Sequence, residues 1–201
     1  DGIVVKANTI ENQDRLGTVG REPRWAIAYK FPSDQALTKL LDIRINVGRT
    51  GSINPYAILD PVEVGGVIVR QATLHNKDYI DEKDLRIGDS VLVQRAGEVI
   101  PQIVRSESSL RTGNEIVFKM PDECPSCAGP LSKINDEVAV FCTNVSCPAQ
   151  LERLVEHFVS KPAMDIGGFG IKLALTLIQH GYIADISDIY YLNKELLLGA
   201  K

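Results

Sequence analysis

Cysteine is the residue type in this chain whose spacing points most clearly to chemistry. All four cysteines fall within 24 residues, in the pattern C-x2-C, fourteen residues, C-x4-C. Each close pair can place two thiolates on one ion, and four sulfurs at about 2.3 Å complete the tetrahedral shell of Zn²⁺. Four protein ligands leave no position for water, which is typical of a structural metal. We therefore predict a structural zinc site formed by Cys124, Cys127, Cys142 and Cys147.

Two other uses of these cysteines stay open at this point. Two disulfides are possible, although no secretory context supports them. A rubredoxin-like iron site is also possible, although its spacing usually repeats C-x2-C on both sides. The metal would fold a loop-rich segment that is too small to hold a core of its own.

A glycine-rich turn follows the cysteines. Its sequence, Ile166-Gly-Gly-Phe-Gly-Ile-Lys172, resembles the turn of a helix-hairpin-helix motif. Gly168 and Gly170 would let the backbone approach a phosphate, and the free amides of the following helix would point at that anion. Lys172 adds a positive charge. Such contacts hold the DNA backbone without reading sequence. The alternative is an ordinary packing corner between two helices.

Two lysines end apolar strands near the N-terminus. In Trp25–Phe31 the alternation places the bulky side chains on one face, which we expect to be core. The other face carries Ala26, Ala28 and Lys30, a shallow trough that suits a nucleotide with its phosphate at the ammonium. Lys6 ends a similar strand. The alternative is that each lysine simply points to solvent.

The elements that must position these residues change in type along the chain. Short β-rich runs with turn signals between them fill residues 37–118, which predicts a small closed barrel, with the OB-fold favoured. A generic barrel without a nucleic-acid role is the alternative. An amphipathic helix is predicted over 151–159, and Gly181 should end a second helix. Ser187 is predicted to cap a third, which carries Ile189, Tyr190, Leu192, Leu196 and Leu197.

The charge balance narrows the possible partners. The net charge is −4, with 16 Lys+Arg against 16 Asp+Glu in residues 1–121 and 6 against 10 in residues 122–201. DNA contacts must therefore come from a few arginines and backbone amides, not from a general positive field. Hydrophobic residues make up 44%, which excludes a disordered chain, and no apolar run approaches the ~20 residues of a membrane span. The chain opens on Asp1-Gly2 without a signal peptide, so we expect a fragment.

These pieces together resemble the bacterial NAD-dependent DNA ligases. Residues 1–6 resemble motif IV of the covalent nucleotidyltransferases, and residues 21–32 resemble the ligase form of motif V. The barrel carries three further signatures, VGRTG at 47–51, ATLHN at 72–76 and RAGEVIPQ at 95–102. The cysteines and the hairpin follow in the family's order.

The resemblance implies a multidomain protein, mainly β followed by α. Residues 1–34 would end an adenylation domain and residues 35–120 would form an OB-fold. Residues 121–149 would be a four-cysteine zinc finger, and residues 150–201 would begin a helix-hairpin-helix domain. The expected context is the bacterial cytoplasm, in DNA replication and repair, as a monomer away from membranes.

The resemblance also implies a reaction and its residues. A lysine takes AMP from NAD, passes it to the 5′-phosphate of a nick in duplex DNA, and the 3′-hydroxyl expels it. Lys6 and Lys30 would hold the adenylate phosphate, and Asp1 would help to position Mg²⁺ or Mn²⁺. Strand parity places Asp1 opposite Lys6 unless Gly2 bends the strand. The nucleophile motif Lys-x-Asp-Gly is absent from these residues, so we expect the chain alone to be inactive.

The DNA contacts implied are Arg49 and Arg95 at the backbone, with Val99 and Ile100 at the minor groove. Ordinary barrel core is the alternative for the apolar pair. His75 is interpreted as a structural, hydrogen-bonded histidine. Two other functions stay open: a nicked-duplex clamp that performs no chemistry, and an ATP- or GTP-using relative such as a capping enzyme.

Overall fold

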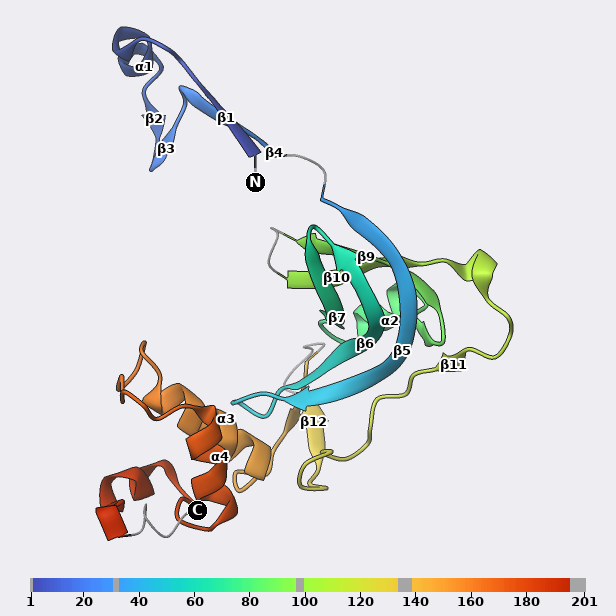
Figure 1. The fold of residues 1–201 in the computed structure, drawn as a ribbon, viewed down its shortest axis with the longest axis vertical. Coiled ribbons are helices and arrows are strands. Elements are labelled where there is room, and N and C mark those ends of the chain that lie inside the picture. Colours follow the sequence, from blue (N-terminus) through green and yellow to red (C-terminus); the bar gives the residue numbers. More distant parts are fainter. Residues whose placement is uncertain (1, 31–32, 97–99, 134–138, 196–201) are drawn as a thin grey trace.

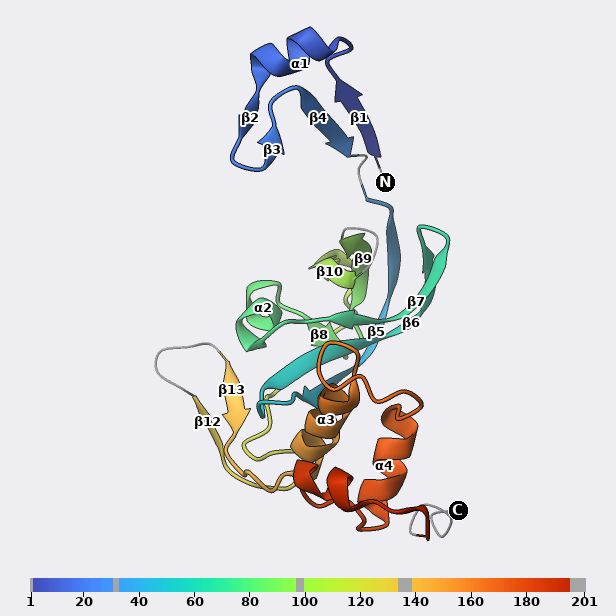
Figure 2. The ribbon, with the colours of Figure 1, turned by 90° about the vertical axis from the view of Figure 1, so that its left-hand side faces the viewer.

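The structure, a computed structural model, describes residues 2–30, 33–96, 100–133 and 139–195. They form an N-terminal hairpin unit, a β-barrel, a small cysteine-bearing module and a pair of helices (Figure 1). The hairpin unit lies at one end and the helices at the other, with the barrel between them in both views (Figure 2). Among the described residues, no helix is long and apolar enough to cross a bilayer.

The N-terminal unit is built on an antiparallel pair of strands, β1 (Gly2–Lys6) and β4 (Ala26–Lys30). Between them lie α1 (Ile10–Leu16), β2 (Thr18–Val19) and β3 (Glu22–Pro23). The sequence did not predict α1, because its residues, IENQDRL, offer too few apolar side chains for a stripe. Thr9 caps this helix by accepting a hydrogen bond from the Asn12 N–H at 3.4 Å.

The bulky face of β4 is not core, contrary to the prediction. Ile27 is 71% exposed and Tyr29 is 60% exposed, and their cross-strand neighbours Val5 and Ile3 are 61% and 54% exposed. The register is as alternation requires, with the four side chains on one face. A two-stranded sheet, however, has no second layer of its own to cover that face.

The barrel is a closed five-stranded sheet in the order β10-β7-β6-β5-β9. Its strands are β5 (Gln35–Val47), β6 (Ile53–Val64), β7 (Val67–Thr73), β9 (Ser90–Ala96) and β10 (Ile100–Ser106). All pairs are antiparallel except β10 with β7. A five-stranded closed barrel of this kind is the OB-fold, as predicted.

Strand β5 closes the barrel because it serves two neighbours. Residues 35–39 pair with β9, and residues 40–47 pair with β6. The register shifts between Leu40 and Asp42, where the long strand bends, and the curve is visible in Figure 1. The helix α2 (Lys77–Glu82) adds Ile80 to the barrel core. The largest fully buried members of that core are Leu40, Leu59, Leu74 and Ile103.

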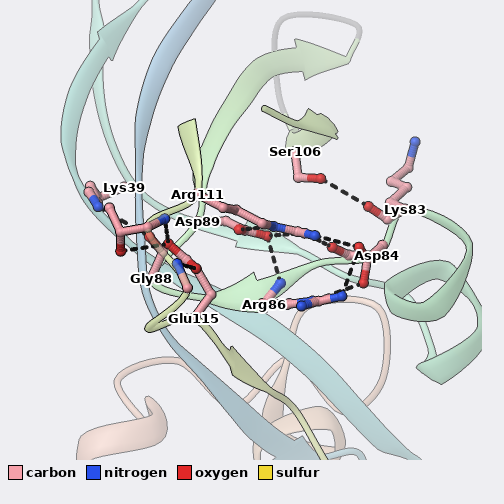
Figure 3. Close-up of polar contacts among 11 residues, drawn as sticks. Lys39, Lys83, Asp84, Arg86, Gly88, Asp89, Ser106, Arg111 and Glu115 are labelled. Atoms are coloured by element: carbon pink, nitrogen blue, oxygen red, sulfur yellow. Dashed lines mark hydrogen bonds and ion pairs between the residues drawn. The ribbon is translucent and has the colours of Figure 1, made fainter. Parts of the chain in front are cut away.

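A buried ion pair fastens the segment that leaves the barrel (Figure 3). The Asp89 side chain is 0% exposed, and Arg111 donates to it from Nε at 2.7 Å and from Nη2 at 2.9 Å. Arg111 also donates to Asp84, and the Arg86 N–H donates to Asp89 at 2.8 Å. Nearby lie the 3-10 helix η1 (Ser108–Leu110) and the paired strands β8 (Arg86–Ile87) and β11 (Ile116–Val117).

The cysteine module contains β12 (Leu131–Lys133) and β13 (Val140–Cys142), and α3 (Pro148–Val159) begins at its end. Helix α4 (Ile171–Gln179) packs on α3 around Val155, Ala174 and Leu177. The third helix differs from the prediction. It is a 3-10 helix, η2 (Ile186–Tyr191), and Asp185 caps it instead of Ser187. The carboxylate of Asp185 accepts from the Ser187 N–H at 2.9 Å and from the Ser187 hydroxyl at 2.6 Å, so Ser187 lies inside the first turn instead of capping it. Leu196 and Leu197 lie outside the described residues.

Candidate functional site

The four cysteine sulfurs converge on one point. All four Sγ atoms lie within 4.8 Å of one another. Cys124 and Cys147 are 3.9 Å apart, and Cys127 and Cys142 are 3.6 Å apart. Four sulfurs at 2.3 Å from one Zn²⁺ stand about 3.8 Å apart, which these distances match. A disulfide requires sulfurs at about 2.05 Å, so neither pair is bonded.

The chemistry of these thiols also suits a cation. Burial raises the pKa of Cys142 to about 12, so the thiol needs a metal to become a thiolate at neutral pH. A hydrogen bond from the Asn144 side chain lowers the pKa of Cys127 to about 7. Three of the four cysteines are buried. The residues present therefore fit a structural zinc ion, which these four side chains would hold.

The cysteine module is attached to the barrel and is not free-standing. Its cysteines share one apolar cluster with Val47 and Ile53, at the ends of β5 and β6. The backbone N–H of Cys142 donates to the Gly51 carbonyl at 2.8 Å. Gln150, at the start of α3, is buried and donates to the carbonyls of Cys142 and Asn144, both at 3.1 Å.

The sequence assigned no role to Gln150, and it placed Gly51 in the VGRTG signature without predicting its contact. A signal for Gln150 was available: it lies four residues before Leu154 and eight before Phe158, on the apolar stripe of the helix. A polar residue on a buried stripe needs partners, and the module supplies them. The contact of Gly51 is non-local and left no signal.

Lys6 and Lys30 lie on the same face of the β1–β4 pair. Lys6 pairs with Ala26 and Lys30 pairs with Gly2, so the lysines stand at opposite ends of that face. The separation is four residues along a strand, or about 13 Å. Ala28 pairs with Val4 between them, and Ala26, the other alanine of the predicted trough, pairs with Lys6 on the same face. Both lysines are exposed, and Asp1 lies outside the described residues.

The predicted DNA contacts on the barrel lie in three places: the β5–β6 turn, strand β9 and a groove lined by β10. Arg49 is exposed on the tight turn between β5 and β6. Arg95 reaches the β6–β7 turn, where Nη1 donates to the Gly65 carbonyl at 3.4 Å. Val99 lies outside the described residues. Ile100 is 57% exposed, which excludes barrel core. It lines a groove of about 520 Å³ with Pro101, Asn54, Gln71, Thr73 and Arg153.

The glycine turn before α4 leaves its backbone open. Gly168 has φ +80, and a Cβ on Gly168 or Gly170 would meet no atom within 4 Å. Helix α4 has no side-chain cap, because its N-cap residue is Gly170. The first amides of the helix are therefore available to an anion. Lys172 is exposed in the first turn.

The structure gives the His75 ring an aromatic contact instead of the side-chain hydrogen bond that was expected. Its backbone has φ 55, and its ring meets Tyr79 edge-on with centroids 4.9 Å apart. The Tyr79 hydroxyl donates to the Ile103 carbonyl at 2.5 Å. The imidazole thus packs on a side chain that is itself anchored to the barrel.

Comparison with known proteins places these parts in one family. Residues 1–34 match the model of the NAD-dependent DNA ligase adenylation domain. Residues 37–115 match the NAD-dependent DNA ligase OB-fold domain, and residues 123–149 match the NAD-dependent DNA ligase C4 zinc finger domain.

Whole relatives agree with the domain matches. The chain is 51% identical over 195 residues to the DNA ligase of Clostridioides difficile (strain 630), covering 97% of this chain and 29% of that protein. It is 53% identical over 196 residues to the DNA ligase of Roseiflexus castenholzii, covering 97% and 27%. It is 50% identical over 198 residues to the DNA ligase of Listeria innocua, covering 98% and 30%. The chain thus spans about three tenths of the length of the curated relatives it matches. By these matches, the chain belongs to the NAD-dependent DNA ligase family.

Proposed function

We propose that this chain is the part of an NAD-dependent DNA ligase that binds nicked duplex DNA and positions the adenylate phosphate. The whole enzyme would seal single-strand nicks through enzyme-AMP and DNA-adenylate intermediates, with release of nicotinamide mononucleotide and AMP. The observation that carries the proposal is the order of parts in one chain: adenylation-domain strands, an OB barrel and a four-cysteine module.

The cationic face of β1 and β4 supports the first part of the proposal, the binding of the adenylate phosphate. Phosphoryl transfer builds negative charge on non-bridging oxygens, so a catalyst must hold cations around them. Lys6 and Lys30 share one exposed face, with an apolar floor between them. NAD supplies the adenylyl group when bound, Mg²⁺ or Mn²⁺ would share the phosphate charge, and Asp1 would help to position that ion. The lysines would orient that phosphate and stabilise it during transfer.

Four regions of the chain support the proposed binding of DNA. Arg49 would contact the sugar–phosphate backbone from its turn, and Arg95 would do so from β9. Ile100 would lie against the minor groove together with Val99. The turn at Gly168 and Gly170, with Lys172, would hold a phosphate through backbone amides. These contacts are sequence-independent, as the joining of any nick requires.

We further propose that the ligase acts as a monomer in the bacterial cytoplasm. Four free cysteines that converge on a metal site suit a reducing compartment.

Nick sealing by the full-length ligase tests the proposed function. The substrate is a duplex with one 5′-phosphorylated nick, supplied with Mg²⁺ and either NAD or ATP. Sealing with NAD alone, and release of nicotinamide mononucleotide, is the expected result. Sealing with ATP would identify a different class of nucleotidyltransferase. Tight binding of the nick without sealing under either condition would identify a clamp that performs no chemistry.

A further inference from the structure

The metal site and a DNA-contact turn meet at one peptide unit. Arg49 and Thr50 occupy the centre of a tight turn, which the Gly51 N–H closes by donating to the Gly48 carbonyl at 2.9 Å. The Gly51 carbonyl in turn accepts from the N–H of the metal ligand Cys142. The turn that presents Arg49 is therefore hydrogen-bonded directly to a zinc-ligand residue.

The fit at Gly51 admits no side chain. Gly51 is buried and has φ +83, a conformation that residues with a Cβ rarely adopt. A Cβ there would lie 2.4 Å from the Cys142 carbonyl oxygen and 3.0 Å from Nε2 of Gln150. Any side chain at position 51 must push the Cys142 backbone away from the turn.

Gln150 completes the junction from the other side. Its amide donates to the carbonyls of Cys142 and Asn144. Gln150 and Asp89 are the buried polar side chains of the described residues. Both backbone polar groups of Cys142 are thus used, one by the Arg49 turn and one by helix α3.

We propose that Gly51 and Gln150 are positioning residues that link metal occupancy of the four-cysteine site to the orientation of the Arg49 turn. The metal site then controls the affinity for the DNA backbone without contacting DNA. This inference rests on the proposed DNA contact of Arg49. Linkage is reciprocal, so bound DNA must also slow the loss of zinc.

A double-variant cycle in the full-length, zinc-loaded ligase tests the coupling. The variants are Gly51→Ala, Arg49→Ala and both together, with Gly113→Ala as the matched control. Gly113 has φ +93, but a Cβ there would meet nothing within 4 Å. The control therefore reproduces the backbone strain without the contact. Two quantities are measured: the affinity for nicked duplex over a range of salt concentrations, and the rate of zinc transfer to a chelator.

The expected result has three parts. Gly51→Ala weakens DNA binding about tenfold and speeds zinc transfer about tenfold, whereas Gly113→Ala changes neither by more than about twofold. The salt slope of log affinity falls by about 0.9 in Gly51→Ala, as for loss of one phosphate contact. In the Arg49→Ala background, Gly51→Ala has no further effect on DNA affinity, because the contact it misplaces is already gone.

Additive losses in the double variant, or equal losses in the two glycine variants, would overturn the coupling while leaving the proposed function intact. Failure of the wild-type protein to bind the nick would overturn both. Should Gly51→Ala not fold, Gln150→Leu takes its place in the same cycle. This substitution removes both hydrogen bonds and keeps a side chain of similar length.

Discussion

At the scale of single residues, the four cysteines would stabilise, through a bound metal, a module whose apolar core is too small to fold it alone. The buried members of the apolar cluster in the module over residues 121–149 are three of its own cysteines and two barrel residues, Val47 and Ile53. Without a metal, four thiols at these distances give little cohesion, and Cys142 stays protonated because burial raises its pKa. Metal binding supplies on the order of 10 kcal/mol in isolated zinc modules.

Removal of zinc should therefore unfold the module and spare the barrel. After chelation, we expect the backbone amides of Cys124 and Cys142 to lose protection from hydrogen exchange. Those of Val91 and Val93, in the separate barrel core, should keep it. Exchange measured by mass spectrometry with and without chelator gives the answer. A module that stays protected without metal would mean that packing alone folds it.

The ion pair of Arg111 with Asp89 is a second interaction between single residues that stabilises the fold. Arg111→Ala leaves a fully buried carboxylate without its cation, which should lower the free energy of unfolding by about 3–5 kcal/mol. Arg105→Ala is the matched control, since its pair with Glu107 is solvent-exposed and should cost less than about 1 kcal/mol. Urea unfolding followed by circular dichroism measures both. Similar losses in the two variants would show that burial of Asp89 adds nothing.

Glu115 makes the connecting segment sensitive to acid. Backbone N–H groups of Thr112 and Gly113 donate to its carboxylate and, with Thr112 contributing most, lower its pKa to about 2. A carboxyl whose pKa is depressed by folding stabilises the protein above its ordinary value of 4.5. That contribution is lost as the pH falls through the folded pKa. We expect the unfolding midpoint to fall more between pH 4.5 and about 2 in wild type than in Glu115→Gln. If the unfolding midpoints of wild type and Glu115→Gln depend on pH in the same way, Glu115 does not contribute to the acid sensitivity.

At the scale of elements, helix α4 should bind phosphate through its open N-terminus. Gly168→Ala forces a side chain into the left-handed region, at about 1 kcal/mol, and places a methyl group beside the phosphate path. We expect DNA affinity to fall about tenfold, the effect of losing roughly one to two hydrogen bonds to a charged group.

Gly181→Ala is the control for this element. Gly181 follows the other end of α4, with φ +73 and equally open space around it. It should lose similar stability but bind nicked duplex as wild type does. Fluorescence anisotropy with a labelled nicked duplex compares the two variants. Equal affinities of the Gly168→Ala and Gly181→Ala variants for nicked duplex would show that the turn only packs two helices together and does not bind DNA.

The elements also show where sequence patterns hold and where they fail. Alternation predicted β5, β6 and β9, because each of these strands buries one face in the barrel. It failed on β4, whose bulky face is exposed for want of a second layer. The short helices α1 and α2 were missed, since one turn or two carry little periodicity. The cap of η2 was misplaced by two residues because serine and aspartate cap equally well, and only the fold decides between them.

At the scale of the whole molecule, residue type and spacing predicted the geometry of two groups of residues. The four cysteines converge as predicted, and the two lysines share a face as the strand period requires. The roles of the lysines, of Arg49 and of Arg95 remain predictions, as do the domain boundaries at residues 34, 120 and 149. The contacts of Gly51, Gln150 and Arg111 were unpredictable, because each joins segments remote in the chain through geometry that no local pattern encodes.

We propose that the functions are divided along the length of the molecule, with the adenylate phosphate held at one end and DNA held by the other parts. The β1–β4 pair, which carries Lys6 and Lys30, lies at one end and the helices lie at the other, with the barrel between them (Figure 1). A change at the lysine face should therefore alter the rate of sealing without altering the affinity for DNA.

Lys30→Ala in the full-length ligase tests this separation, and Lys119→Ala, at an exposed lysine between the barrel and the cysteines, is the control. The measurement is the rate of nick sealing beside the affinity for the same nick. We predict that Lys30→Ala lowers sealing by about 100-fold or more while the affinity stays within about twofold, as expected when a transition-state cation is lost. Lys119→Ala should change neither. Loss of both quantities together, or of neither, in Lys30→Ala would contradict the role of the lysine face.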